Sequence, residues 1–155
     1  MKSSYAVLLS GSLLAFTAMS AQADELPMRK AGLWEVKVKL SVPGVPKLSE
    51  RPETGTRYCV TEASEKERME QAKKTDDKCS KNEIKKVTTG YTLEAVCQSE
   101  DGGTSTYHGT YTGDLHSAYT FKQLQQVRGG SMGDMDVYAT EEHKWINATC
   151  PADMK

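Results

Sequence analysis

The sequence has little of several features from which function is usually inferred. It holds 20 basic and 21 acidic residues, mixed along its length, so neither charge dominates. This balance leaves no electrostatic footprint for a nucleic acid or an anionic membrane surface, and no nucleic-acid partner is expected. The one long apolar run, from Tyr5 to Met19, is too short to cross a bilayer comfortably. No internal repeat or low-complexity tract is present.

The motifs of catalysis and of nucleotide binding are missing too. A nucleophilic serine often sits in a G-x-S-x-G turn, and residues 130–133 (GSMG) match that pattern only superficially. His108, His116 and His143 show neither an H-E-x-x-H nor an H-x-H spacing, so no two are expected to share a metal ion. The glycines at 102–103 are typical of a hairpin turn. We therefore predict no catalytic residue, no cofactor and no enzymatic activity.

What the sequence does contain begins with an export signal. Lys2 precedes the apolar run, and Ala21-Gln22-Ala23 has the small-x-small pattern that a signal peptidase recognises. We expect cleavage after Ala23, which makes residues 1–23 a signal peptide and residues 24–155 a single β-rich domain. No cysteine stands at the cleavage point, so we expect neither a lipid anchor nor stable membrane insertion of the mature chain.

All four cysteines lie in the mature part of the chain: Cys59, Cys79, Cys97 and Cys150. An even number of cysteines in an exported chain predicts two disulfides. A metal site of four thiolates would need closely spaced C-x₂-C pairs, which are absent. The cysteines are therefore predicted to be structural.

Alternation with a period of two predicts a mainly β fold. Trp34, Val36, Val38 and Leu40 alternate with charged residues, which is typical of a strand with one buried face. Turn residues divide most of the remaining chain into similar short segments. The predicted strands are residues 33–40, 54–60, 84–89, 91–98, 104–111, 117–127, 134–140 and 143–150. Strands joined by short turns predict a single curved antiparallel meander, shaped like half a barrel.

One helix is predicted, over residues 62–74. Good helix formers dominate this segment, and Thr61 or Ser64 is available as its N-cap. Its apolar residues are few: Ala63, Met69 and Ala72. The buried stripe is therefore narrow, and we expect the helix to lie across the sheet as a cover.

Strand parity favours one of the three possible disulfide pairings. Cys97 and Cys150 each share a predicted strand face with apolar residues, so both sulfurs should point into the core. Cys59 turns away from that core, and Cys79 lies just beyond the helix that follows it. We therefore predict a Cys97–Cys150 disulfide and a Cys59–Cys79 disulfide.

Three stretches carry a resemblance to a known family: residues 30–46 (KAGLWEVKVKLSVPGVP), 57–67 (RYCVTEASEKE) and 110–121 (TYTGDLHSAYTF). With the last cysteine, they resemble small exported proteobacterial proteins catalogued as a domain of unknown function. The resemblance covers most of residues 31–150. It implies a periplasmic location and a β-rich fold, and it supplies no activity or catalytic residue.

The predicted function is that of an exported, disulfide-stabilised, non-catalytic binding or accessory protein of the cell envelope, with an unidentified envelope protein as partner. One alternative is a carrier whose concave sheet holds a small apolar ligand. The rings that would line such a cleft are Trp34, Trp145, Tyr107, Tyr111, Tyr119 and Phe121. Another alternative is copper binding through Met132, Met135 and His143, because thioether sulfur is a soft ligand.

Overall fold

The computed structural model describes residues 24–45, 54–73, 78–131 and 133–154. The predicted signal peptide, residues 1–23, lies outside these ranges. The described elements are β1 (Gly32–Ser41), β2 (Thr54–Val60), α2 (Glu62–Lys73), β3 (Cys79–Val87), β4 (Gly90–Gln98), β5 (Thr104–Gly113), β6 (Ala118–Arg128), β7 (Met135–Asn147) and the short helix η1 (Ala152–Met154).

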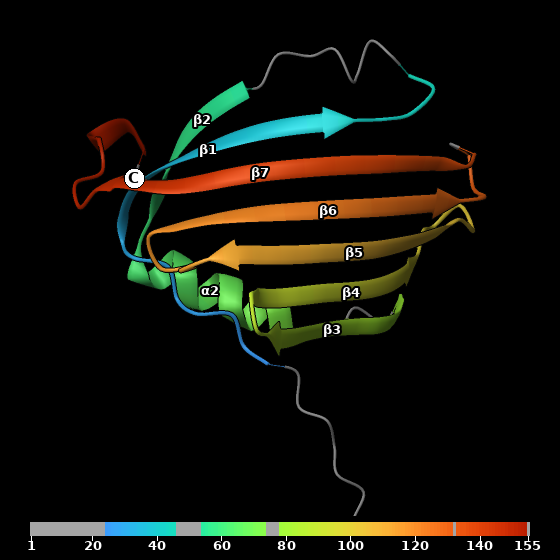
Figure 1. Cartoon of the computed structure of the whole chain (residues 1–155), viewed down its shortest axis with the longest axis horizontal. Helices are drawn as coiled ribbons and strands as arrows, with labels where there is room; N and C mark the ends of the chain where they lie inside the picture. The colour runs from blue at the N-terminus through green and yellow to red at the C-terminus, as the bar shows by residue number, and fades with distance from the viewer. Residues whose placement is uncertain (1–23, 46–53, 74–77, 132, 155) are drawn as a thin grey trace, which may run out of the picture.

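The strands form one open antiparallel sheet in the order β2-β1-β7-β6-β5-β4-β3 (Figure 1). From β3 to β7 each strand pairs with the next one in the chain, which confirms the predicted meander. β1 then pairs with β7, and β2 pairs with β1 at the outer edge. The mainly β fold class is therefore confirmed, and the sheet does not close, because β2 and β3 lie at opposite edges.

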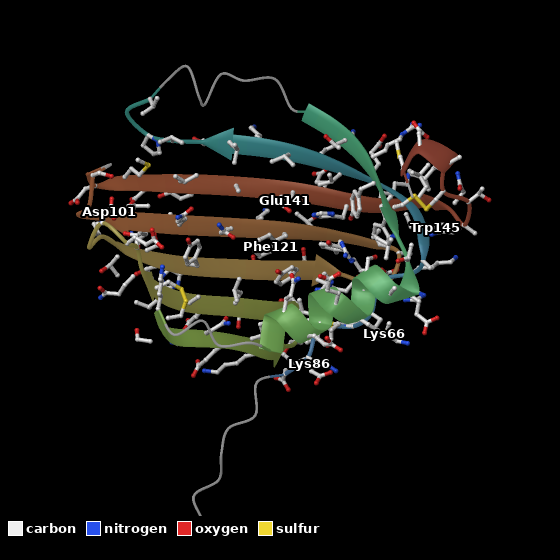
Figure 2. All side chains as sticks on the ribbon, turned by 180° about the vertical axis from the view of Figure 1, so that it is seen from behind. Lys66, Lys86, Asp101, Phe121, Glu141 and Trp145 are labelled. Carbon is white, nitrogen blue, oxygen red and sulfur yellow. A yellow bond between two sulfur atoms is a disulfide. The ribbon has the colours of Figure 1, made fainter. Side chains whose placement is uncertain are left out.

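α2 connects the two edges of the sheet. Every neighbouring pair of strands is antiparallel, and six such steps separate β2 from β3, so these two edge strands point in the same direction. The connection from the end of β2 to the start of β3 must therefore cross a face of the sheet. Figure 2 shows α2 lying across one face, which we call the inner face; the opposite face is the outer face. The helix begins at the predicted N-cap, where Thr61 Oγ1 accepts the Ser64 N–H and Ser64 Oγ accepts the Thr61 N–H. Within the described part of the chain, no helix is long and apolar enough to span a membrane.

Several predicted strand boundaries were wrong, and the last strand ends at Asn147, before Cys150. The segments 134–140 and 143–150 form the single strand β7, because Glu141 is paired with Val38 of β1 on one side and with Phe121 of β6 on the other. The backbone hydrogen bonding of this strand therefore continues through Glu141 and Glu142, which interrupt the alternation of apolar and polar residues in the sequence. β3 also begins earlier than predicted, at Cys79, because β4 pairs along its whole length.

The chain before β1 closes one end of the inner face. The Asp24 N–H donates to the carbonyl of Ile84 (3.0 Å), and the Lys30 N–H donates to the carbonyl of His116 (2.9 Å). Between these anchors, Leu26 is buried with Tyr91 and Leu115. The residues directly after the predicted cleavage point are therefore part of the folded structure.

The Gly32-Leu33-Trp34 start of β1 is a tight junction of the sheet. Gly32 has a φ of +131°, and a Cβ there would lie 2.2 Å from the carbonyl oxygen of Asn147. Only glycine fits this approach of β1 to β7. Trp34 is 0% exposed, and its indole N–H donates to the carbonyl of Lys30 (2.8 Å). The first strand is thus anchored to the core as its alternation predicted.

The predicted disulfide pairing was wrong. Cys59 is bonded to Cys150, and Cys79 is bonded to Cys97. Cys79 and Cys97 are register partners on β3 and β4, whereas Cys59 lies on the opposite edge strand, β2. Cys150 lies beyond the end of β7, so strand parity assigns it no face. The partner also depends on the order of strands in the sheet, which places Cys59 and Cys79 at opposite edges.

Each disulfide can be removed as a pair of serine substitutions. The Cys59→Ser/Cys150→Ser variant should lose about 4 to 5 kcal/mol of unfolding free energy, and the Cys79→Ser/Cys97→Ser variant about 3 kcal/mol, because the first disulfide closes the longer loop. The sequence separations are 91 and 18 residues. Urea unfolding measures both losses, and a non-reducing peptide map that joined Cys59 to Cys79 would contradict the pairing.

Candidate functional site

A buried carboxylate joins α2 to the rest of the molecule. The side chain of Glu65 is 1% exposed and lies between two arginines. Arg29, from the segment before β1, donates to it through its backbone N–H (2.9 Å) and its Nε (2.9 Å). Arg68, one turn along α2, donates through Nε (3.1 Å) and Nη2 (2.5 Å). Two guanidinium groups and one backbone amide thus satisfy a single carboxylate.

The hydrogen bonds continue from Arg29 across the inner face. Arg29 Nη1 donates to the hydroxyl oxygen of Tyr58 (3.3 Å), which lies 2.9 Å from Nδ1 of His143. Nε2 of His143 lies 2.9 Å from Oε2 of Glu141. Because an ionised carboxylate can only accept, Nε2 carries the imidazole proton, and Nδ1 accepts the Tyr58 proton. The result is a chain of groups, from Glu65 to Glu141, that links α2, β2 and β7.

Burial and charge shift the pKa values along this chain. Burial alone would raise the pKa of Glu65, but the hydrogen bonds from Arg68 and Arg29 outweigh it and lower the pKa to about 2. Burial raises the pKa of Tyr58 well above its usual range. Burial also lowers the pKa of His143, against the opposing effect of Glu141. At neutral pH the network therefore holds ionised Glu65, neutral Tyr58 and neutral His143.

Stacked rings form the layer beneath this network. The His143 ring stacks on Tyr119 with centroids 4.3 Å apart, and Tyr111 stacks on Phe121 at 4.2 Å. Phe121 lies over Gly109, where a Cβ would come within 2.6 Å of its ring. Most rings that the sequence suggested as the lining of an open cleft are thus packed against one another.

The buried side of α2 differs from the prediction. Ala63 and Ala72 are exposed, and the deeply buried residue of the helix is Glu65. Sequence reasoning missed Glu65 because it stands among other glutamates and lysines of the helix, without a distinguishing pattern. It also missed Arg29, which lies in a segment with no predicted element.

The part of the inner face beyond α2 is less covered. Along β1, inner-face exposure rises from Trp34, which is 0% exposed, through half-buried Val36 and Val38, to Leu40 at 40%. On the neighbouring β7, Val137 and Ala139 are also half-buried. This aliphatic area is one part of the inner face that remains partly accessible to solvent; Gln123 and Gln125 of the neighbouring β6 are half-buried as well.

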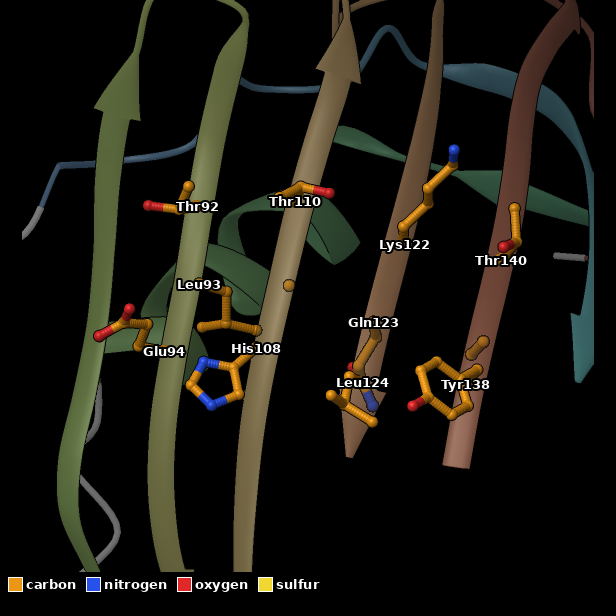
Figure 3. Close-up of a pocket in the computed structure, with 12 residues that line it drawn as sticks. Thr92, Leu93, Glu94, His108, Thr110, Lys122, Gln123, Leu124, Tyr138 and Thr140 are labelled. Atoms are coloured by element: carbon orange, nitrogen blue, oxygen red, sulfur yellow. The ribbon is translucent and has the colours of Figure 1, made fainter. Parts of the chain in front are cut away.

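The outer face carries a hollow of about 440 Å³ (Figure 3). Figure 3 views it from the side opposite α2, and the lining side chains form two lines across the strands. One line holds Thr92, Thr110, Lys122 and Thr140, and the other holds Glu94, His108, Leu124 and Tyr138. Its floor is the sheet itself, so the hollow is an open furrow with hydroxyl groups on one side and larger side chains on the other.

The copper site suggested by the sequence was wrong as formulated. Met135 and His143 lie eight residues apart on β7, a distance of about 27 Å along an extended strand. One ion cannot bind both, and both ring nitrogens of His143 are already hydrogen-bonded. Met132 lies outside the described residues. No group of three or more His, Cys, Asp or Glu side chains suited to a metal ion occurs among the residues that the structure describes.

Comparison with known proteins identifies a family. The model of the family described as "Protein of unknown function (DUF3617)" matches residues 29–150. No curated protein and no solved structure matches the chain. The matched range contains the elements from β1 to β7, both disulfides and the network around Glu65.

Replacing Glu65 tests whether its charge holds α2 in place. Glu65→Gln should lose about 3 kcal/mol of unfolding free energy, because Arg29 and Arg68 keep their charges without a carboxylate. A carboxylate whose pKa is lower in the folded than in the unfolded state stabilises the fold at pH values above its unfolded pKa. The unfolding free energy of the wild type should therefore fall as the pH drops from about 4.5 toward about 2, and this fall should be absent in the variant. Urea unfolding over this pH range measures both effects.

The matched control is Glu62→Gln, on the same helix, where the carboxylate is 74% exposed and paired with Lys66. It should change the unfolding free energy by no more than about 0.5 kcal/mol. Equal losses for the two variants would contradict a special role for Glu65.

Proposed function

Because this match covers most of the chain, the chain belongs to that family of proteins of unknown function, and we propose that it is an exported, disulfide-stabilised binding or accessory protein of the cell envelope that performs no catalysis. The observation that carries the proposal is the pairing of all four cysteines. One disulfide fastens the edge strand β2, and the other fastens the edge strand β3. Such bonds persist in oxidising compartments and are rare in the cytosol.

Two further observations support the proposal. Asp24, the first residue after the expected cleavage point, is hydrogen-bonded to β3 through its backbone and its carboxylate, so the fold makes use of the chain from there onward. His143 has a perturbed pKa, which often marks a functional site. Its two ring nitrogens are hydrogen-bonded to Tyr58 and Glu141, so the ring is fixed in position within the network.

Expression of the whole chain in a bacterium with a general secretory pathway tests export. The protein should appear in the periplasmic fraction with Asp24 as its first residue and with no thiol that reacts with a maleimide before reduction. Ala23→Leu should block processing, since the peptidase requires a small residue there, whereas the adjacent Gln22→Leu should not. Intact, unprocessed chain in the cytosol with reactive thiols would refute export, and turnover of a generic ester, phosphate or glycoside would refute the absence of catalysis.

A second candidate function is a carrier of a small apolar ligand. It is favoured by the half-buried aliphatic area beyond α2, formed by Val38, Leu40, Val137 and Ala139 of the two adjacent strands β1 and β7. A site of this kind would hold the ligand against side chains of the sheet, with α2 at one end. In this function the stacked rings support the helix instead of lining the site.

A fluorescent naphthylamine probe tests the carrier function. Wild-type protein should enhance probe fluorescence, and Ala139→Asp should weaken binding about tenfold, which corresponds to about 1.4 kcal/mol, because it places a charge on the inner face. Thr140→Asp adds the same charge on the outer face of the same strand and should leave the affinity unchanged. Equal effects of the two substitutions, or no enhancement with the wild type, would exclude this binding area.

A further inference from the structure

One line of outer-face residues differs from its surroundings. Register pairing places one residue from each of six adjacent strands, β1, β7, β6, β5, β4 and β3, side by side on this face. We call this line the outer row, and its residues are Lys39, Thr140, Lys122, Thr110, Thr92 and Lys85. With strands about 4.8 Å apart, the row extends about 24 Å across the sheet.

The outer row contains ammonium and hydroxyl groups and no carboxylate. Lys39 and Lys122 have no ion-pair partner among the described residues, whereas Lys85 is paired with Glu83 (2.9 Å). Both unpaired lysines are exposed. They lie two strands apart, so their attachment points are separated by about 10 Å. On the furrow side of the row, Glu94 is bound by Lys81. On the other side, exposed Glu142 stands two residues from Thr140 on β7, between the strands that carry the two lysines. The row itself is therefore a line of two unpaired lysines with hydroxyl groups beside them, bordered by one carboxylate on the side away from the furrow.

The line beside the outer row supplies apolar surface. His108, Leu124 and Tyr138 occupy the next register positions on β5, β6 and β7, and Tyr138 is 45% exposed. The furrow of about 440 Å³ lies between this line and the outer row (Figure 3). An occupant of the furrow would thus meet hydrogen-bonding groups on one side and an aromatic and an aliphatic side chain on the other.

We propose that the outer row binds a linear acidic polysaccharide, laid across the strands with its carboxylates at Lys39 and Lys122. Sugar rings have hydroxyl edges and apolar faces, which match the threonines of the row and the Leu124 and Tyr138 side chains. The spacing of the two lysines is close to the length of two linked sugar rings, so a carboxylate on alternate sugars fits it. This proposal deepens the binding role proposed above, and it does not depend on export.

The charge density favours a polysaccharide over other polyanions. Duplex DNA carries one charge per about 1.7 Å and requires a dense basic surface. Recognition of anionic lipid uses clusters of about four to eight basic residues. The outer row offers two unpaired lysines over about 24 Å, and the whole chain has a net charge of −1. A polymer with sparse carboxylates is the anionic chain that this surface complements.

Titration of the purified mature protein with hyaluronan oligosaccharides tests the proposal, because these carry one carboxylate on every second sugar. The wild type should bind, with an affinity that falls as salt is raised. The same oligosaccharide with its carboxylates methyl-esterified should bind much more weakly. Lys122→Gln should weaken binding about fivefold, which corresponds to the largest free energy usual for one exposed charge pair, about 1 kcal/mol. The double variant Lys39→Gln/Lys122→Gln should weaken binding further. Backbone amide shifts in NMR spectra should be confined to β1 and β4 to β7, around the residues of the outer row and the line beside it.

The matched control is Lys144→Gln, an exposed lysine on the same face of β7 but outside the outer row. It makes the same change in net charge and should leave the affinity within about twofold, since only long-range screened interactions are lost. The proposal is overturned if the wild type does not bind, if the esterified oligosaccharide binds equally well, or if Lys144→Gln and Lys122→Gln have equal effects. Equal binding of duplex DNA or anionic vesicles through the same lysines would also overturn it. None of these outcomes affects the cellular location of the protein.

Discussion

The ion pairs of Glu65 are the interaction on which the arrangement of the inner face depends. α2 has no apolar stripe wide enough to dock it by hydrophobic burial. Its position is set instead by one carboxylate shared between Arg29, in the segment before β1, and Arg68, on the helix itself. A buried charge tolerates few geometries, because its partners must lie within hydrogen-bonding distance. The helix, the first residues of the described chain and the edge strand β2 therefore take up one mutual arrangement.

This arrangement follows from how the strands are connected. β2 and β3 run in the same direction at opposite edges, so the connection between them must cross a face of the sheet. The crossing element lies over one end of the inner face (Figure 2), and at the other end Leu40 is 40% exposed. The disulfides hold the same two edge strands, which are the ones with a neighbour on only one side. Exposed edges are the weak points of an open sheet, and here each is covalently fastened.

The two faces of the sheet are therefore suited to different kinds of contact. The inner face combines a hydrogen-bonded network at one end with an aliphatic area at the other. The outer face carries the polar residues of each alternating strand. Its binding properties depend on which of these side chains the register places side by side on neighbouring strands. On the inner face, Tyr58, His143 and Glu141 are hydrogen-bonded in series, and on the outer face His108 lies opposite Glu94.

Much of the fold could be predicted because its signals are local. Alternation about Trp34 and Val36 identified β1, the turn residues separated the hairpins, and Thr61 marked the start of α2. The candidate site could not be predicted in the same way. Glu65 resembles every other glutamate of its helix, and Arg29 meets it only because two segments far apart in the chain come together. The outer row likewise exists only once the registers of six strands are known.

The sequence by itself determined that the chain forms strands with one apolar face, one helix and enough cysteines for two disulfides. These features depend on side-chain periodicity and backbone preference over a few residues. Tertiary structure alone decided which strands became neighbours, and with them the partners of Cys59 and Cys79, the burial of Glu65 and the alignment of Lys39 with Lys122. The physical reason is that strand pairing is a non-local choice: parity assigns a residue to a face, and only the strand order and register say what lies beside it.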